Sequence, residues 1–92
     1  MTVVIQIGNS DDKLTQKEWA AYVQDVKGAI AGWPKETHFA GASLPFEAWQ
    51  NACFVLNVEE DRLVDLKENL RYITKKWRQD SIAFTTGTTE FI

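Results

Sequence analysis

The sequence predicts an α+β domain of the ferredoxin-like kind, with a four-stranded antiparallel sheet and two helices on one face. Its 92 residues make one compact domain, and 45% of them are hydrophobic. Apolar residues form four short strand-like segments and two segments with helical spacing. The order of these segments is β-α-β-β-α-β, and each βαβ half closes through a right-handed crossover. We therefore expect residues 1–92 to form a single domain.

The first half of the chain contains one strand and a well-marked helix. Thr2–Gly8 is rich in β-branched residues and ends at a glycine, which is typical of a buried strand. Thr15 and Glu18 have the spacing of a capping box, so a helix begins there, and Gly32 and Pro34 end it. The predicted apolar face of this helix is formed by Trp19, Tyr22, Val23, Val26 and Ile30.

The second half contains three strands and the other helix. Lys35–Ala42 and Gln50–Val58 are predicted strands, and Ser81–Thr86 is the last strand, ended by Gly87. Between them, residues 59–77 carry acidic side chains at the start and basic ones at the end, as the helix dipole favours. Residues 88–92 form a short C-terminal tail. The apolar stripe of the second helix is formed by Leu63, Leu66, Leu70, Ile73 and Trp77.

The predicted topology brings three polar connections to one end of the sheet, which we call the rim: Gly8–Lys13, Ser43–Trp49 and Trp77–Ser81. The first helix also directs its free amides toward the rim, where they favour an anionic group. A small polar ligand stacked on Trp49 would suit this end. Alternatively, the loops are polar only because they are solvated. The candidate ligand-binding residues are Asn9, Ser10, Asp11, Asp12, Trp49, Gln50, Asn51, Arg78, Gln79, Asp80 and Ser81.

The face of the sheet opposite the helices, here called the open face, is predicted to carry small or apolar side chains and few charges. Such a face suggests a cover, and a second copy of the chain is the simplest one. The alternatives are a modest exposed patch or a cover formed by residues 88–92. The predicted homodimer interface contains Val4, Gln6, His38, Ala40, Cys53 and Val55, and the same face should include Ala42, Asn57, Ala83 and Thr85.

Composition argues against several classes of function. Ten Lys and Arg against thirteen Asp and Glu give a net charge of −3, which makes nucleic acid an unexpected partner. One cysteine excludes an internal disulfide and a Cys-cluster metal site. The spacing of Asp11, Asp12 and Asp80 fits no metal motif, so we predict no metal and no cofactor. The chain has no apolar segment long enough for a membrane span, and we expect it in the cytoplasm.

Two segments carry a resemblance to known proteins. Residues 5–15 (Ile-Gln-Ile-Gly-Asn-Ser-Asp-Asp-Lys-Leu-Thr) and 78–83 (Arg-Gln-Asp-Ser-Ile-Ala) resemble those of small bacterial and phage proteins without an assigned activity. The chain is also similar to the CRISPR-associated Cas2 nucleases, ferredoxin-like dimers in which an acidic residue follows the first strand. Here Gly8 and Asn9 stand at that place, and the basic surface of a nucleic-acid partner is missing.

Taken together, these patterns favour a non-enzymatic binding protein that recognises a small polar or nucleotide-like ligand at the rim. With the resemblance, they suggest a phage-encoded inhibitor of host defence that sequesters such a ligand or blocks a host protein. One alternative is a small dimeric enzyme (an isomerase, hydrolase or nuclease) that uses His38 or the group Asp11, Asp12 and Asp80. Another is a protein–protein adaptor that acts through the open face.

Overall fold

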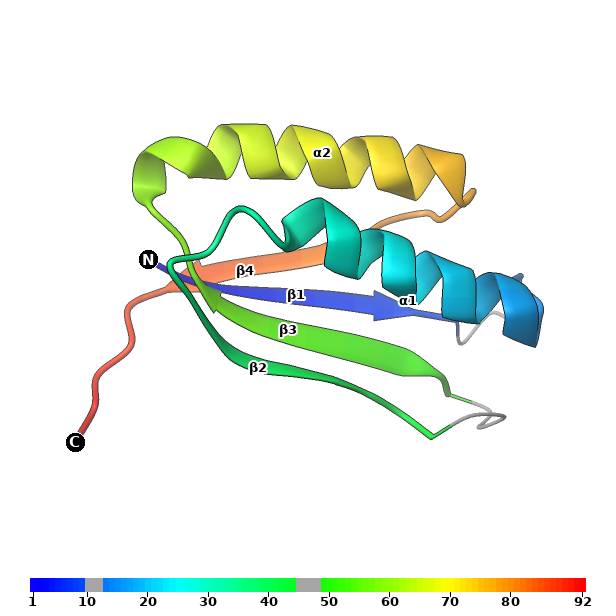
Figure 1. Cartoon of the computed structure of the whole chain (residues 1–92), viewed down its shortest axis with the longest axis horizontal. Coiled ribbons are helices and arrows are strands. Elements are labelled where there is room, and N and C mark those ends of the chain that lie inside the picture. The colour runs from blue at the N-terminus through cyan, green and yellow to red at the C-terminus, as the bar shows by residue number, and fades with distance from the viewer. Residues whose placement is uncertain (10–12, 45–48) are drawn as a thin grey trace.

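The computed structural model describes residues 1–9, 13–44 and 49–92, and it confirms the ferredoxin-like arrangement (Figure 1). One antiparallel sheet has the strand order β2-β3-β1-β4. Helices α1 (Gln16–Ile30) and α2 (Leu63–Lys76) lie side by side on one face, and a short 3₁₀ turn, η1 (Glu60–Arg62), precedes α2. The strands are β1 (Thr2–Gly8), β2 (Glu36–Ala42), β3 (Asn51–Asn57) and β4 (Ala83–Gly87).

Helix α1 begins as its capping residues predict. The Thr15 Oγ1 accepts a hydrogen bond from the Glu18 amide at 3.2 Å, and the Glu18 carboxylate accepts one from the Thr15 amide at 3.0 Å. These two bonds satisfy amides that the first turn of a helix leaves without partners. The five predicted apolar residues of α1 are all buried: Trp19, Tyr22, Val23, Val26 and Ile30.

The core lies between the helices and the central strands β1 and β3. Because side chains alternate along a strand, every second residue of these strands faces the helices. Strand β4 begins at Ala83, two residues later than predicted, and Gly87 is its last residue rather than the break after it. The buried core side chains of β1, β3 and α2 are Val3, Ile5, Ile7, Ala52, Phe54, Leu56, Leu66, Leu70 and Ile73.

Strand β2 departs from the predicted alternation. A register shift between Thr37 and Phe39 pairs Phe39 with Val55 and Ala40 with Phe54. Paired residues share a face of the sheet, and Phe54 belongs to the core. The predicted place of Ala40 on the open face is therefore wrong, and Phe39 takes it. Ala42 lies with Ala40 on the helix side, since it pairs with the buried Ala52.

Asp25 joins the two helices near the end of α2. Its carboxylate accepts a hydrogen bond from Trp77 Nε1 at 2.8 Å and pairs with Lys76 Nζ at 2.9 Å. The hydrogen bonds from Lys76 and Trp77 hold the pKa of the Asp25 carboxyl below its ordinary value of 3.8. The charged carboxylate is thus favoured in the folded state.

We expect this carboxylate to contribute to stability at neutral pH and to lose that contribution in acid. A pKa lowered by folding stabilises the protein above the unfolded pKa, and the effect fades as pH falls through the folded value. Asp25→Asn should cost about 1 kcal/mol at pH 7, given two hydrogen bonds at a partly exposed site. Thermal unfolding of both proteins across pH 2–7 tests this; a difference that persists unchanged at pH 2 would refute the role of the charge.

Candidate functional site

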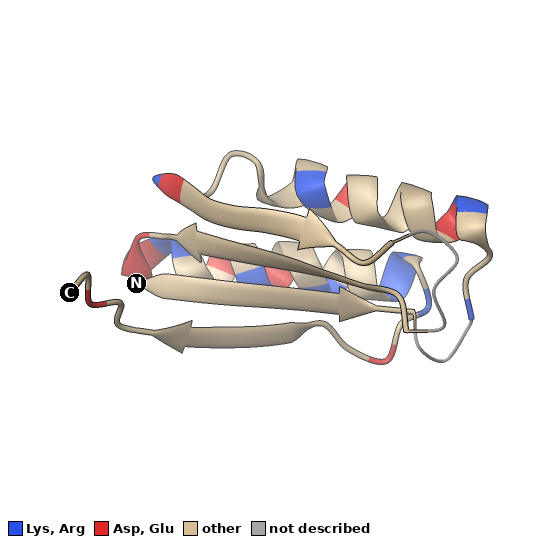
Figure 2. Cartoon of the chain, turned by 90° about the horizontal axis from the view of Figure 1, so that it is seen from below, with Lys and Arg blue, Asp and Glu red and all other residues tan. Residues whose placement is uncertain are grey.

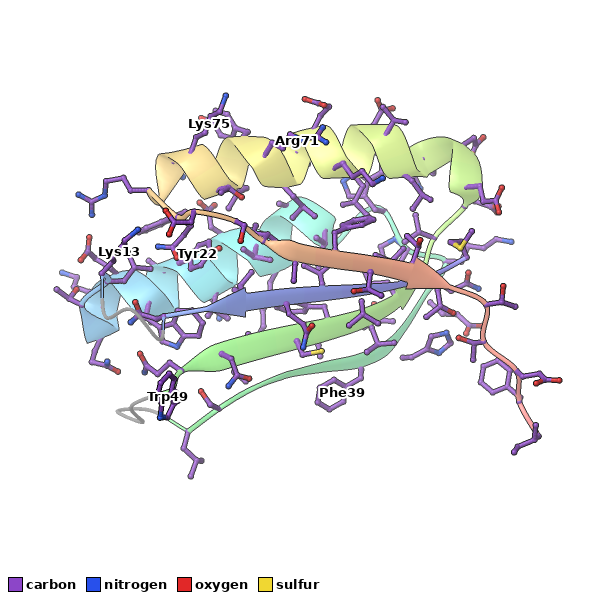
Figure 3. All side chains as sticks on the ribbon, turned by 180° about the vertical axis from the view of Figure 1, so that it is seen from behind. Lys13, Tyr22, Phe39, Trp49, Arg71 and Lys75 are labelled. Carbon is purple, nitrogen blue, oxygen red and sulfur yellow. The ribbon has the colours of Figure 1, made fainter. Side chains whose placement is uncertain are left out.

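Described residues at the ends of the three connections predicted to form the rim lie together at one end of the sheet. Lys13 Nζ lies 3.2 Å from Asp80 Oδ1, although 67 residues separate them. The Asn9 amide donates to the Gln50 carbonyl at 2.9 Å. Figure 3 places Lys13 and Trp49 at this same end. The topology therefore brings together residues that are distant in sequence.

Two of the predicted ligand-binding residues have a structural role at the rim. Asn9 and Gln50 are each only 2% exposed. Asn9 Nδ2 donates to the Leu14 carbonyl at 3.0 Å and to Gln50 Oε1 at 3.1 Å, while Asn9 Oδ1 accepts from the Leu14 amide at 3.0 Å. Gln50 Nε2 also donates to Gln16 Oε1 at 2.7 Å. These bonds join Asn9 and Leu14 to each other and to Gln50, and the burial of Asn9 and Gln50 leaves a ligand no access to either side chain.

Trp49 and Arg78, two further residues of the predicted set, contact different elements of the fold. Trp49 is 74% exposed, and its carbonyl accepts from Asn51 Nδ2 at 2.9 Å at the start of β3. Arg78 Nη2 pairs with Glu18 Oε2 at 3.3 Å beside α1. Ser10, Asp11 and Asp12 lie outside the described residues. Of the predicted residues that the structure describes, only some line a common groove.

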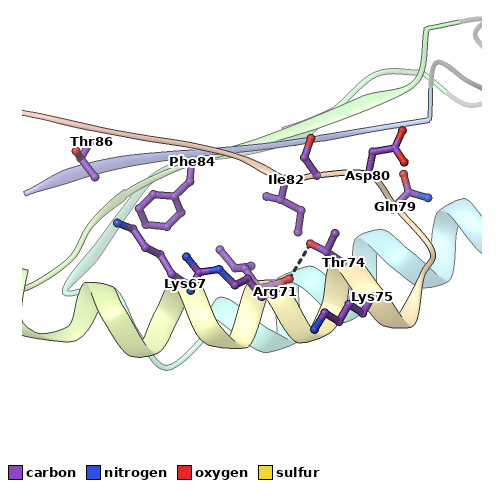
Figure 4. Close-up of a pocket in the computed structure, with 11 residues that line it drawn as sticks. Lys67, Arg71, Thr74, Lys75, Gln79, Asp80, Ile82, Phe84 and Thr86 are labelled. Carbon is purple, nitrogen blue, oxygen red and sulfur yellow. Dashed lines mark hydrogen bonds between the residues drawn. The ribbon is translucent and has the colours of Figure 1, made fainter.

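A groove of about 540 Å³ runs between α2 and β4, and we call it the α2–β4 groove (Figure 4). It begins at the rim, where Gln79, Asp80 and Ser81 form its end, and these are the predicted site residues that line it. Leu70, Ile82 and Phe84 contribute apolar side chains to its wall. Its remaining lining residues are Lys67, Arg71, Thr74, Lys75 and Thr86.

The end of α2 determines where the groove begins. Arg78 adopts a left-handed φ of 54°. Its amide donates to the Lys75 carbonyl at 3.1 Å, and the Gln79 amide donates to the Thr74 carbonyl at 2.9 Å. This pair of bonds is the Schellman motif, which ends a helix and reverses the chain. The reversal directs residues 79–82 back along α2, and they enter β4 opposite the helix.

Three basic side chains of α2 line the groove at four-residue intervals: Lys67, Arg71 and Lys75. Residues at this spacing share one side of a helix. Lys67 extends toward Phe84 of β4, Arg71 runs along α2 toward Lys67, and Lys75 lies along the outer surface of the helix (Figure 4). Lys67 Nζ is 5.3 Å from the centre of the Phe84 ring. Arg71 pairs with Glu68 on the exposed side of the helix, a contact that leaves other guanidinium N–H groups available.

These basic residues were missed by the sequence analysis, although their spacing was a usable signal. From the sequence alone, the helix dipole is a sufficient reason for the positive residues late in α2. Lys67, Arg71 and Lys75 lie beside the apolar stripe of α2. They are therefore close to the strand that packs against that stripe. Asp80 is the acidic residue among those lining the groove, and it pairs with Lys13. An anion would therefore be held away from Asp80, toward Lys67 and Arg71.

His38 lies at the opposite end of the molecule from Asp80. A smaller hollow of about 380 Å³ there is lined by Met1, Thr2, Glu36, His38 and Phe91, among others. His38 Nδ1 is 3.7 Å from Glu36 Oε2, and its ring centre is 6.0 Å from that of Phe91 in the tail. Within the described ranges, no three His, Cys, Asp or Glu side chains come together as metal ligands. His38 and Asp80 do not form a common site.

No protein-family model, curated protein or solved structure matches this chain. The likeness to small phage and bacterial proteins and to Cas2 nucleases thus stays a prediction. Neither described helix has the length and apolar character needed to cross a membrane.

Proposed function

We propose that this protein is a non-enzymatic binding protein that holds a small anionic, nucleotide-like ligand in the α2–β4 groove. The observation that carries the proposal is the row of Lys67, Arg71 and Lys75 above a wall formed by Leu70, Ile82 and Phe84. Positive charge in a partly apolar groove suits a ligand with an anionic part and a flat, apolar part. This refines the ligand expected at the rim, since the groove opens there but extends along α2.

The chemistry of the lining supports binding rather than catalysis. Arg71 can bind a phosphate through two N–H groups, whereas a Lys ammonium acts as a point charge. The described lining includes neither His nor Cys, and Thr74 donates its hydroxyl to the Leu70 carbonyl at 2.8 Å. The described groove therefore offers neither an imidazole as a general base nor a thiol as a nucleophile. A phage-encoded inhibitor that sequesters a nucleotide-like signal would need only such a site.

Calorimetric titration with ADP and with adenosine tests the proposal on the full chain. We expect ADP to bind, and we expect its affinity to fall as salt is raised, because exposed charge pairs are screened. Adenosine should bind at least about tenfold more weakly, since it lacks the charged groups that Lys67 and Arg71 recognise. Equal affinity for the two compounds, or no binding of either, would overturn the proposal.

We also propose that the open face is covered by a second copy of the chain. The proposal is supported by the strand pairing, in which Val4, Cys53 and Val55 share one face of the sheet with Phe39, which is 55% exposed. Strands β1, β3 and β4 carry no charged residue, and Figure 2 shows the charges of the sheet confined to the start of β2. Because each chain carries a net charge of −3, a neutral face is the surface on which two copies repel least.

Phe39→Glu should convert the dimer to a monomer, because it places a charge from each copy on the apolar faces that are brought together. Light scattering should give twice 10.5 kDa for the natural chain and 10.5 kDa for the variant. Tyr72→Glu is the matched control, since Tyr72 is an exposed aromatic residue on α2. A natural chain that is monomeric at high concentration would exclude the dimer.

A further inference from the structure

Strand β4 is an edge of the sheet, and its outer side borders the α2–β4 groove. The Asn9 amide donates to Gln50, and the Val58 amide donates to Met1. Odd-numbered residues at both ends of β1 therefore bond to β3. Since backbone groups alternate in direction along a strand, the even-numbered residues of β1 bond to β4.

The register then shows which backbone groups of β4 are free. The even-numbered residues of β1 pair with Ala83, Thr85 and Gly87. Phe84 and Thr86 consequently direct their N–H and C=O groups away from β1, toward the outer edge. Their side chains face the helix side, where both line the groove. The same two residues thus offer unpaired backbone groups and contribute to the groove wall.

The two edges of the sheet differ in how they are protected. Edge strands commonly carry a bulge, a charged residue or a proline that prevents another strand from pairing with them. The other edge strand, β2, has the register shift at Thr37–Phe39 and carries Glu36. Strand β4 reads Ala-Phe-Thr-Thr-Gly and has a continuous register with β1. It has none of these three devices, although it is short.

The basic row of α2 matches the repeat of an added strand. Residues four apart in a helix rise by about 6.0 Å along its axis. Alternate residues of a strand, which share a face, are about 6.8 Å apart. A strand added outside β4 would direct every second side chain toward α2, near Lys67 and Arg71. Because the two repeats are nearly equal, acidic side chains at successive positions of this kind would each lie near one basic side chain of α2.

We propose that β4 accepts an extended acidic segment of a partner protein as a fifth strand of the sheet. The backbone of the segment would pair with Phe84 and Thr86, and its alternate Asp or Glu side chains would pair with Lys67 and Arg71. Main-chain bonds of this kind supply affinity, and the side chains supply specificity. The inference goes beyond the proposed small ligand but uses the same basic residues, so the segment and ADP would compete.

A set of fluorescent peptides tests this proposal without altering the protein. The first alternates Glu with Val, and the second has the same composition with its Glu residues in one block. Two further peptides carry N-methyl groups on alternate residues. One is methylated at its odd-numbered residues and the other at its even-numbered residues, because an N-methyl group removes a backbone donor. Binding is measured by fluorescence anisotropy, and amide hydrogen exchange is measured at Phe84 and Thr86.

We expect the alternating peptide to bind at least about tenfold more tightly than the block peptide, since only it places a carboxylate at each basic residue. One N-methyl set should abolish binding and the other should not. The bound peptide should slow exchange at Phe84 and Thr86 while leaving Thr85, which already bonds to β1, unchanged. Equal effects of both N-methyl sets, or unchanged exchange at Phe84 and Thr86, would overturn the added strand.

The failures of the two proposals are distinguishable. Binding of ADP without binding of the alternating peptide would refute the added strand and leave the small ligand in place. Binding of the peptide without binding of ADP would refute the small ligand and leave the added strand in place. If both bind and ADP does not displace the peptide, the shared basic residues are refuted for the peptide.

Discussion

Arg71→Glu should weaken the binding of ADP about 30-fold, which makes it the variant with the largest expected effect on function. The substitution removes the guanidinium that can hold a phosphate through two N–H groups, and it places a carboxylate in the middle of the basic row. In the natural chain Arg71 pairs with Glu68, so the substitution also places two carboxylates side by side. Calorimetric titration in low salt measures the change.

Lys17→Glu is the matched control for this variant. Lys17 is exposed in the first turn of α1 and does not line the groove, and its reversal changes the net charge of the chain by the same amount. We expect its ADP affinity to stay close to that of the natural chain. If both variants lose affinity equally, the ligand responds to overall charge and the groove is not its site.

Asn9→Ala should lower the free energy of unfolding by about 2–3 kcal/mol, because it leaves buried partners without their hydrogen bonds. The partners are the Leu14 amide, the Leu14 carbonyl and Gln50 Oε1, all within 3.1 Å of the Asn9 side chain. In a domain of this size the melting temperature should fall by roughly 10–20 °C. The sequence alone suggested a different role for Asn9, that of a residue that binds a ligand.

Asn51→Ala serves as the comparison in the same melting experiment. Asn51 is exposed at the rim, where its amide donates to the Trp49 carbonyl at 2.9 Å. Its removal leaves no buried group unsatisfied, so we expect a change below about 1 kcal/mol. An Asn9 variant as stable as the Asn51 variant would show that the network of Asn9 and Gln50 does not hold the rim together.

The strand and helix order was predictable because local signals agree along most of the chain. The capping box at Thr15, the alternation in β3 and the apolar stripe of α2 each indicate one type of element. Strand β2 was the exception. A bulge inserts one residue into a ladder and reverses the faces of the residues on one side of it. Nothing in the composition of residues 36–42 marks that position, so Ala40 was placed on the wrong face.

The site was harder to predict because polar residues near a turn can bind the chain itself as well as a ligand. Asn9 and Gln50 are 41 residues apart, and only the fold reveals that they satisfy each other. The four-residue spacing of Lys67, Arg71 and Lys75 is visible in the sequence. That these residues line a groove could be seen only once the fold placed β4 beside α2. Asp80 was correctly placed near the connection from β1 to α1, as its contact with Lys13 shows.

The position of β2 has a consequence for how the molecule opens. Six of its seven residues are exposed and the seventh is partly so, because neither helix covers this strand. Its one neighbouring strand in the described sheet is β3. Local opening is easiest where few apolar side chains are buried. Residues 36–42 should therefore detach while the core stays intact, which makes them the first segment exposed to proteases and the segment most readily exchanged between neighbouring molecules.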